Sequence, residues 1–100
     1  MARMSYSGKI VLVSASAYRP ERDDAFLRDL LAARIELFCA VGVDAEKWEE
    51  ALDWTCIGED GLGEYVIVTT SHKDKSLAEV VAFAEAFDTR VPHSVQVVCR

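Results

Sequence analysis

Short apolar runs along the chain alternate with longer segments in which apolar residues recur at helical spacing. Lys9–Ser14 contains the clearest run, because its apolar residues are continuous, as in a strand whose two faces are both covered. Shorter runs of the same kind predict three further strands, at residues 54–57, 65–70 and 94–99. Gln96 interrupts the last run, which indicates a strand at the edge of the sheet.

Helical spacing predicts two long helices and a short one between them. The first covers residues 20–41, because a proline fits its first turn and Gly42 provides a stop. Asp44 caps the short helix that follows. A capping-box sequence, Ser-x-x-Glu, opens the segment 76–87 and predicts the third helix there.

The predicted elements follow the order β-α-α-β-β-α-β, which is typical of a single α/β domain. The glycine-rich segment 58–63 is short, so the second and third strands are expected to form an antiparallel hairpin. We therefore predict a mixed four-stranded sheet in the order 2-3-1-4, with helices packed on both faces and the strands that begin at Lys9 and Tyr65 side by side in its centre. The domain covers residues 9–100, after a loose N-terminal leader at residues 1–8. A two-layer arrangement, with every helix on one face, is the alternative.

The composition is that of a soluble globular domain, and it narrows the classes of function. Of the 100 residues 51% are hydrophobic, and 11 Lys and Arg against 17 Asp and Glu leave a net charge of −6. An acidic surface repels the phosphates of nucleic acid, and no apolar run is long enough to cross a membrane, so neither is an expected partner. The three cysteines form no CxxC motif, which indicates reduced thiols in a cytoplasmic protein that holds no metal and no cofactor.

Polar side chains follow the first and the third predicted strands, where each strand leads into a helix. The carboxyl ends of parallel strands and the amino ends of helices are common places for an anionic ligand. The residues that would form such a site are Ser14, Ser16, Arg19, Ser71, His72 and Lys73. The alternative is that these residues are ordinary caps and turn residues, since the chain has no glycine-rich phosphate motif. No catalytic residue is assigned, because neighbours on a strand, such as Ser71 and His72, point to opposite faces.

Three further features predict contacts with another protein. Arg34 falls within the apolar arc of the first predicted helix, where it is either a structurally paired side chain or one that faces a partner. Acidic residues surround Trp48 and Trp54, as in an interface with an aromatic centre and a charged rim, the alternative being a solvated acidic face. Small residues at Ala78 and Ala82 would let another surface approach the third helix, although alanine is also a good helix former.

Two segments resemble a family of small uncharacterised bacterial proteins. One runs from Thr-Thr-Ser-His at residues 69–72 into Ser-Leu-Ala-Glu-Val-Val-Ala-Phe-Ala at residues 76–84, and the other is Glu-Glu-Ala-Leu-Asp-Trp at residues 49–54. The resemblance implies a bacterial cytoplasmic α/β domain and brings no established activity. It draws attention to Ser71 and His72 without assigning them a reaction.

These observations favour a non-catalytic protein-interaction or accessory module over an enzyme. A homodimer or another protein is the expected partner. An immunity-type role, in which the acidic domain neutralises a basic partner, is one concrete version. The alternative is a binder of a small anionic ligand, or an enzyme, that uses the loops after the first and third strands.

Overall fold

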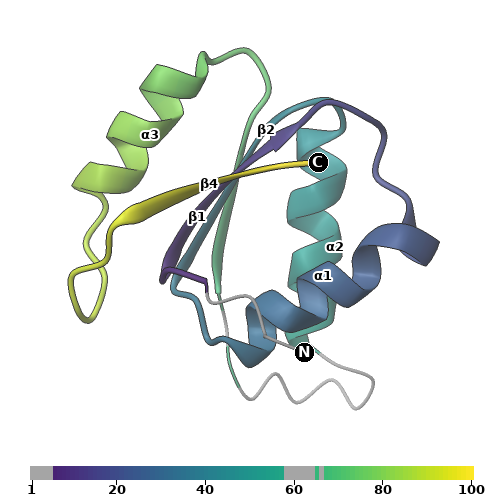
Figure 1. The fold of residues 1–100 in the computed structure, drawn as a ribbon, viewed down its shortest axis with the longest axis horizontal. Coiled ribbons are helices and arrows are strands. Elements are labelled where there is room, and N and C mark those ends of the chain that lie inside the picture. The colour runs from purple at the N-terminus through teal and green to yellow at the C-terminus, as the bar shows by residue number, and fades with distance from the viewer. Residues whose placement is uncertain (1–5, 58–64, 66) are drawn as a thin grey trace.

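Four parallel strands form the centre of the molecule in the computed structural model, which describes residues 6–57, 65 and 67–100. They lie in the order β3-β2-β1-β4, and Figure 1 shows the sheet nearly edge-on in the middle of the molecule. Their bounds are β1 Lys9–Ser14, β2 Leu37–Gly42, β3 Val68–His72 and β4 Val95–Cys99. All the strands run the same way, so every connection between them must cross from one end of the sheet to the other.

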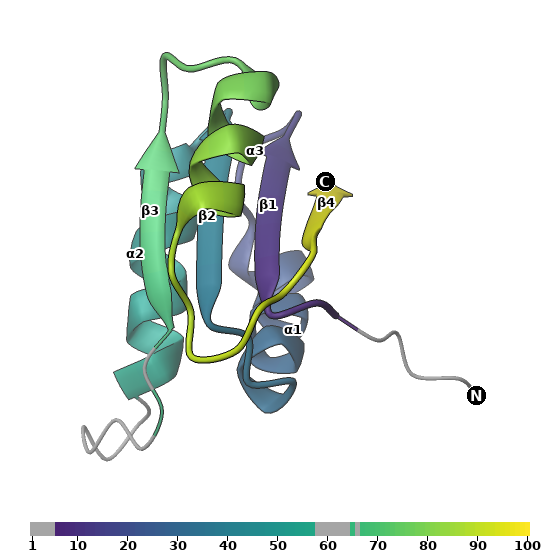
Figure 2. The same ribbon diagram turned by 90° about the vertical axis from the view of Figure 1, so that its left-hand side faces the viewer.

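Three helices make these crossings: α1 Pro20–Ala32, α2 Ala45–Ile57 and α3 Leu77–Ala86. Figure 2 shows α1 and α2 behind the sheet and α3 in front of it. Two separate hydrophobic clusters correspond to these two faces. The chain is therefore an α/β domain with helices on both faces of a parallel sheet.

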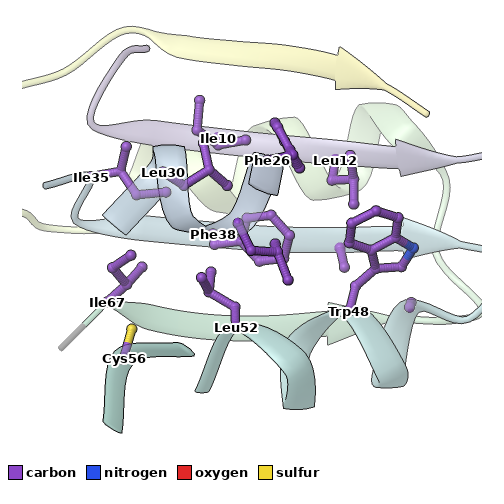
Figure 3. Close-up of a cluster of buried hydrophobic side chains, with 13 residues drawn as sticks. Ile10, Leu12, Phe26, Leu30, Ile35, Phe38, Trp48, Leu52, Cys56 and Ile67 are labelled. Atoms are coloured by element: carbon purple, nitrogen blue, oxygen red, sulfur yellow. The ribbon is translucent and has the colours of Figure 1, made fainter. Parts of the chain in front are cut away.

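The larger core cluster lies between the sheet and the helices α1 and α2 (Figure 3). Alternate residues of β1 and β2 contribute to it, because side chains along a strand point to opposite faces. Its largest fully buried side chain is Trp48. On the other face Val11 and Cys39 pack with Val80 of α3, and this second cluster is smaller because one helix covers four strands. The α3 face of the outer strands is consequently less covered.

The predicted helix over residues 20–41 is wrong in its second half. α1 ends at Ala32, Arg34 follows in the left-handed conformation with φ 54°, and the chain enters β2 at Leu37. β2 is apolar at nearly every position, and such a continuous run fits a wide helical arc as well as it fits a buried strand. No proline or glycine separates the end of α1 from the start of β2, so the sequence gives no sign that the helix stops there.

The predicted strand at residues 54–57 is also wrong, because α2 continues to Ile57. Leu52 and Cys56, four residues apart, both face the core, as helical spacing requires. The predicted antiparallel hairpin is therefore wrong as well, because its first strand is part of α2. β3 pairs in parallel with β2 instead, with Val68 opposite Leu37. The glycine-rich segment 58–63 lies outside the described residues, as does most of the predicted leader.

The predicted strand order placed the strands that begin at Lys9 and Tyr65 side by side, and the structure contradicts this. β1 lies between β2 and β4, and β3 lies at an edge, although β1 and β3 do run in the same direction. The unpredicted strand β2 is buried from Leu37 to Val41 and takes the central place beside β1. The edge position predicted for the last strand is confirmed.

The beginning of α3 agrees with the prediction. The Ser76 hydroxyl accepts a hydrogen bond from the Glu79 backbone N–H at 3.2 Å, and the Glu79 carboxylate reaches back to the Ser76 N–H, which completes the capping box. Phe87 caps the other end of the helix. This signal is local in sequence, which explains why the chain reveals it without knowledge of the fold.

Replacing Gly42 by alanine should lower the free energy of unfolding by about 1–3 kcal/mol. Gly42 has a φ of +100°, and a Cβ built on it would lie 2.4 Å from the backbone oxygen of Ser14 on the neighbouring strand. Urea denaturation of Gly42→Ala measures the loss. Val43→Ala, at the exposed next position, is the control and should change stability by less than about 0.5 kcal/mol. Equal stability of the two variants would contradict the close approach.

Candidate functional site

The carboxyl ends of the strands form one edge of the sheet, where Ser14 of β1 lies beside Gly42 of β2 and Val41 beside His72 of β3. The chain order around β1 reverses at this edge, since β2 lies on one side of β1 and β4 on the other. In open parallel sheets such a reversal is the usual place for a ligand crevice. This edge is therefore where a ligand site is expected.

A buried carboxylate, Asp23, occupies the reversal point. It is fully buried on the first turn of α1 and accepts two hydrogen bonds of 2.8 Å from the Arg22 guanidinium. Nε of Arg100, just after β4, lies 3.3 Å away, and the Arg19 backbone N–H donates at 2.9 Å. Burial by itself would raise the pKa of Asp23, but these hydrogen bonds and the Arg22 charge outweigh it and hold the pKa below its ordinary value. Asp23 thus joins α1 to the end of β4.

Nothing in the sequence distinguishes Asp23 from Glu21, the other acidic residue in the first turn of α1, where the helix dipole favours negative charge. Arg100 also stacks over the Phe26 ring, with its guanidinium carbon 4.4 Å from the ring centroid. A carboxylate that touches residues at the far end of the chain has no signature in its sequence neighbours. The Asp23 carboxylate is occupied by Arg22 and Arg100, so its observed role at this edge of the sheet is to hold the fold together.

The three predicted ligand residues after β1 have different environments. Ser14 is buried; its hydroxyl donates to the Ser16 carbonyl at 2.7 Å and accepts from the Trp48 indole N–H at 3.0 Å. Ser16 and Arg19 are exposed. The Ser14 hydroxyl therefore links β1 to α2, and the two other residues remain open to solvent.

The predicted ligand residues at the end of β3 divide between the two faces of the sheet. The Ser71 hydroxyl points to α2 and donates to Glu49 at 3.3 Å. The His72 ring points to α3, where it lies 5.0 Å from the Phe83 ring. Lys73 is exposed. β2 separates this group from Ser14, so the strand adjacency on which a shared site depended is wrong, and anion binding by either loop stays a prediction.

A cavity of about 470 Å³ lies between the start of α1 and the outer face of α2. Its lining combines aromatic, aliphatic and acidic side chains with one lysine. The lining residues are Tyr18, Pro20, Asp24, Lys47, Glu50, Ala51, Trp54 and Thr55. We call this cavity the Trp54 groove. Its volume is that of a pocket for a small molecule or for one or two side chains of a protein partner.

The wall of the Trp54 groove near α1 is held in place by Tyr18. The Tyr18 backbone N–H donates to Asp44 at 3.1 Å, its hydroxyl donates to Asp24, and its ring lies 5.0 Å from the Trp48 ring at 66°. Burial, and then the hydrogen bond and charge of Asp24, raise the pKa of Tyr18 well above its ordinary value. These contacts position Tyr18 on the wall of the groove.

The opposite wall comes from one face of α2. Lys47, Glu50 and Trp54 recur at helical spacing and line the groove together. Trp54 is 66% exposed, the largest exposed fraction among the large hydrophobic side chains that the structure describes. The Lys47 ammonium lies 4.0 Å from Asp44, so a carboxylate accompanies the one cation of the lining. Asp24 and Glu50 leave the groove with a negative charge.

The structure places the residues predicted for a protein interface in different environments. Trp48 is fully buried in the core, and its prediction as an interface residue is corrected. Arg34 lies after α1 instead of inside it; its guanidinium carbon is 5.0 Å from the centroid of the Tyr65 ring, so the argument from a helical arc is wrong. Ala78 and Ala82 are exposed on α3. Contacts of Arg34, Trp54, Ala78 and Ala82 with a partner stay predictions.

At the amino edge of the sheet a histidine–carboxylate pair joins β2 to the segment before β4. Nε2 of His93 lies 2.5 Å from the Glu36 carboxylate, which also accepts the Arg90 backbone N–H at 2.8 Å. The hydrogen bond from the Arg90 N–H is the largest influence and lowers the pKa of Glu36, against its partial burial. The His93 ring packs directly on Gly8, where a Cβ would lie 2.3 Å from it. This arrangement fastens the segment 88–94 to the sheet.

The fold and the groove define a small parallel α/β domain with an acidic, aromatic-walled surface cavity. The chain belongs to the family of a domain of unknown function, DUF7684, whose model matches residues 1–99. This agrees with the expectation of an uncharacterised family. No curated protein and no solved structure matches the chain.

The described part of the chain contains neither a metal-ligand cluster nor a membrane-spanning helix. No group of three or more His, Cys, Asp or Glu side chains there has the geometry to hold a metal ion. No helix among the same residues has the length and apolar character of a membrane span.

Proposed function

We propose that the protein is a non-catalytic interaction module that binds a basic protein partner in the Trp54 groove. The observation that carries the proposal is the two-thirds exposed indole of Trp54 on the wall of a cavity that also contains the carboxylates of Asp24 and Glu50. An exposed tryptophan beside a preformed cavity is costly to leave in water, and its burial by a partner recovers that cost.

The aromatic wall supports an interface because tryptophan and tyrosine concentrate binding energy. Such residues dominate interface energetics when they are enclosed by a partner in a well-packed pocket. Tyr18 is already fixed by Asp44 and Asp24, so little side-chain entropy is lost on its side of the groove when a partner binds. Trp54 then closes on the partner from α2.

The charge of the groove supports a basic partner. Asp24 and Glu50 line it, and the exposed carboxylate of Glu46 lies on α2 together with Glu50. An arginine side chain matches both features, since its planar guanidinium stacks on an indole and pairs with a carboxylate through two hydrogen bonds. An accessory or immunity-type role, in which this domain covers a basic surface of another protein, is the version of the proposal that the net charge of −6 favours.

Binding of short arginine-rich peptides tests the proposal, with glutamate-rich peptides of equal length for comparison. Arginine-rich peptide should change the fluorescence of exposed Trp54, while glutamate-rich peptide should not. Trp54→Ala should weaken the affinity for the arginine-rich peptide at least about tenfold, as measured by calorimetry. The double variant Asp24→Asn with Glu50→Gln should weaken it by a similar factor. Phe83→Ala, at an exposed aromatic residue on α3, is the matched control and should bind as the original chain does.

The dependence of the affinity on salt concentration distinguishes this mechanism from non-specific apolar binding. Raising the ionic strength should weaken binding of the arginine-rich peptide, because screening reduces its attraction to Asp24 and Glu50. Equal binding of acidic and basic peptides would refute the proposal. So would an affinity that does not change in Trp54→Ala, or no binding of the basic peptide at millimolar concentration.

A further inference from the structure

The outer edge of β4 has unpaired backbone groups. Arg100 exchanges hydrogen bonds with the chain at β1, as its N–H donates to the Val13 carbonyl at 2.9 Å and its carbonyl accepts the Ala15 N–H at 2.7 Å. Backbone groups alternate in direction along a strand, so Val98 and Gln96 also face β1. The N–H and C=O groups of Val95, Val97 and Cys99 therefore point away from the sheet, and among the described residues β4 pairs with β1 alone.

The side chains of Val97 and Cys99 are also uncovered, while Val95 packs partly against the α3 face. Val97 is 42% exposed and Cys99 is exposed, because α3 packs mainly over β1 and β2 (Figure 2). No charged residue and no proline occurs in Val95–Cys99. Natural edge strands usually carry such residues, which prevent them from pairing with another chain.

The strand at the opposite edge of the sheet is more polar. β3 consists mostly of polar residues, and its outer hydroxyl groups are used within the molecule. Thr69 donates to Asp53 at 2.6 Å and Ser71 donates to Glu49 at 3.3 Å, both on α2. The outward residues are thus Thr69 and Ser71 on β3 but Val95, Val97 and Cys99 on β4, which makes β4 the less polar of the two edges.

We propose that β4 pairs antiparallel with β4 of a second copy of this chain, around a twofold axis at Val97, so that two sheets become one continuous sheet. With the axis there, Val97 faces Val97 of the other copy, and Val95 faces Cys99. Each of these pairs brings together residues whose N–H and C=O groups both point outward, so each pair exchanges two hydrogen bonds. Their side chains lie on the α3 face, where apolar groups of the two copies meet.

The strand favours its own copy over a foreign strand because it is self-complementary and uncharged. Two copies that each carry a charge of −6 repel one another, and the uncharged residues of β4 let them meet without opposed carboxylates at the contact. Valine pairs across antiparallel strands add to the stability of the contact. Pairing at β4 is remote from the α2 wall of the Trp54 groove, because α2 packs on β2 and β3.

Analytical ultracentrifugation over a range of protein concentrations tests the proposal. The chain of 11.1 kDa should form a reversible dimer of twice that mass, and added salt should tighten it. Val97→Lys should weaken dimerisation at least about a hundredfold, because two ammonium groups would then oppose one another at the twofold axis. Val68→Lys changes a valine that is similarly exposed, at 44%, on the opposite edge strand, and should leave the dimer intact. Circular dichroism establishes that both variants are folded.

Hydrogen exchange of single amides tests the register without any substitution. The amide protons of Val95, Val97 and Cys99 should exchange more slowly as the protein concentration rises, while those of Gln96 and Val98 should be slow at every concentration. A monomer at millimolar concentration would overturn the proposal. A dimer that Val97→Lys leaves unchanged, or protection that spares Val97, would overturn it as well.

Discussion

Trp48→Ala should lower the free energy of unfolding by about 3–5 kcal/mol, which is a large part of the stability of a domain of this size. Trp48 is fully buried, and its ring packs edge to face with Tyr18 at 5.0 Å and Phe26 at 6.3 Å. Its indole N–H also donates to the buried Ser14 hydroxyl, so its removal leaves both a void and a polar group without its partner.

Thermal and urea denaturation measure this effect, and the melting temperature should fall by about 12 °C or more. Trp54→Ala is the matched control, since it makes the same substitution six positions later on the same helix at a side chain that is 66% exposed. It should change stability by less than about 0.5 kcal/mol while it removes binding of a basic peptide. A reversed result, with Trp54→Ala the less stable variant, would contradict the assignment of one tryptophan to the core and the other to the groove.

Asp23→Asn should lower the free energy of unfolding by about 2–4 kcal/mol, the second large effect that the structure predicts. The amide keeps the size of the side chain but removes the charge that holds Arg22, at 2.8 Å, and Arg100, at 3.3 Å. Both arginines are partly exposed to water, which keeps the cost below that of a fully buried ion pair. Asp29→Asn, at an exposed position of the same helix, is the control and should change stability by less than about 0.5 kcal/mol.

Acid should reduce the difference between the original chain and Asp23→Asn. Because the pKa of Asp23 is lower in the folded protein than in the unfolded chain, its charge contributes stability above the unfolded pKa of about 3.9, and that contribution is lost as the pH falls through the folded pKa. Urea denaturation of both proteins from pH 6 down to pH 2.5 measures this change. A stability difference that stays constant over that range would show that the Asp23 charge is not what joins α1 to β4.

The candidate site divides into residues that local sequence predicts and residues that it does not. Acidic side chains around a tryptophan were visible in the sequence, and the exposed Trp54 beside Glu50 fits that interpretation. The sequence did not distinguish Trp54 from Trp48, because both lie in the same acidic segment. Tyr18 and Asp24, the other wall of the groove, come from a different element and were not predicted to lie there.

Several properties of this protein follow from the sequence by itself: the α/β class, the strands that begin at Lys9 and end at Cys99, the capping box of α3, and the opposite orientations of Ser71 and His72. They depend on neighbouring residues, through propensity, capping and the alternation of side chains along a strand. The tertiary structure decided that residues 37–42 form a central strand, that β3 lies at an edge, and which charges Asp23 holds. Strand pairing and burial join residues far apart in the chain, so no local pattern contains them.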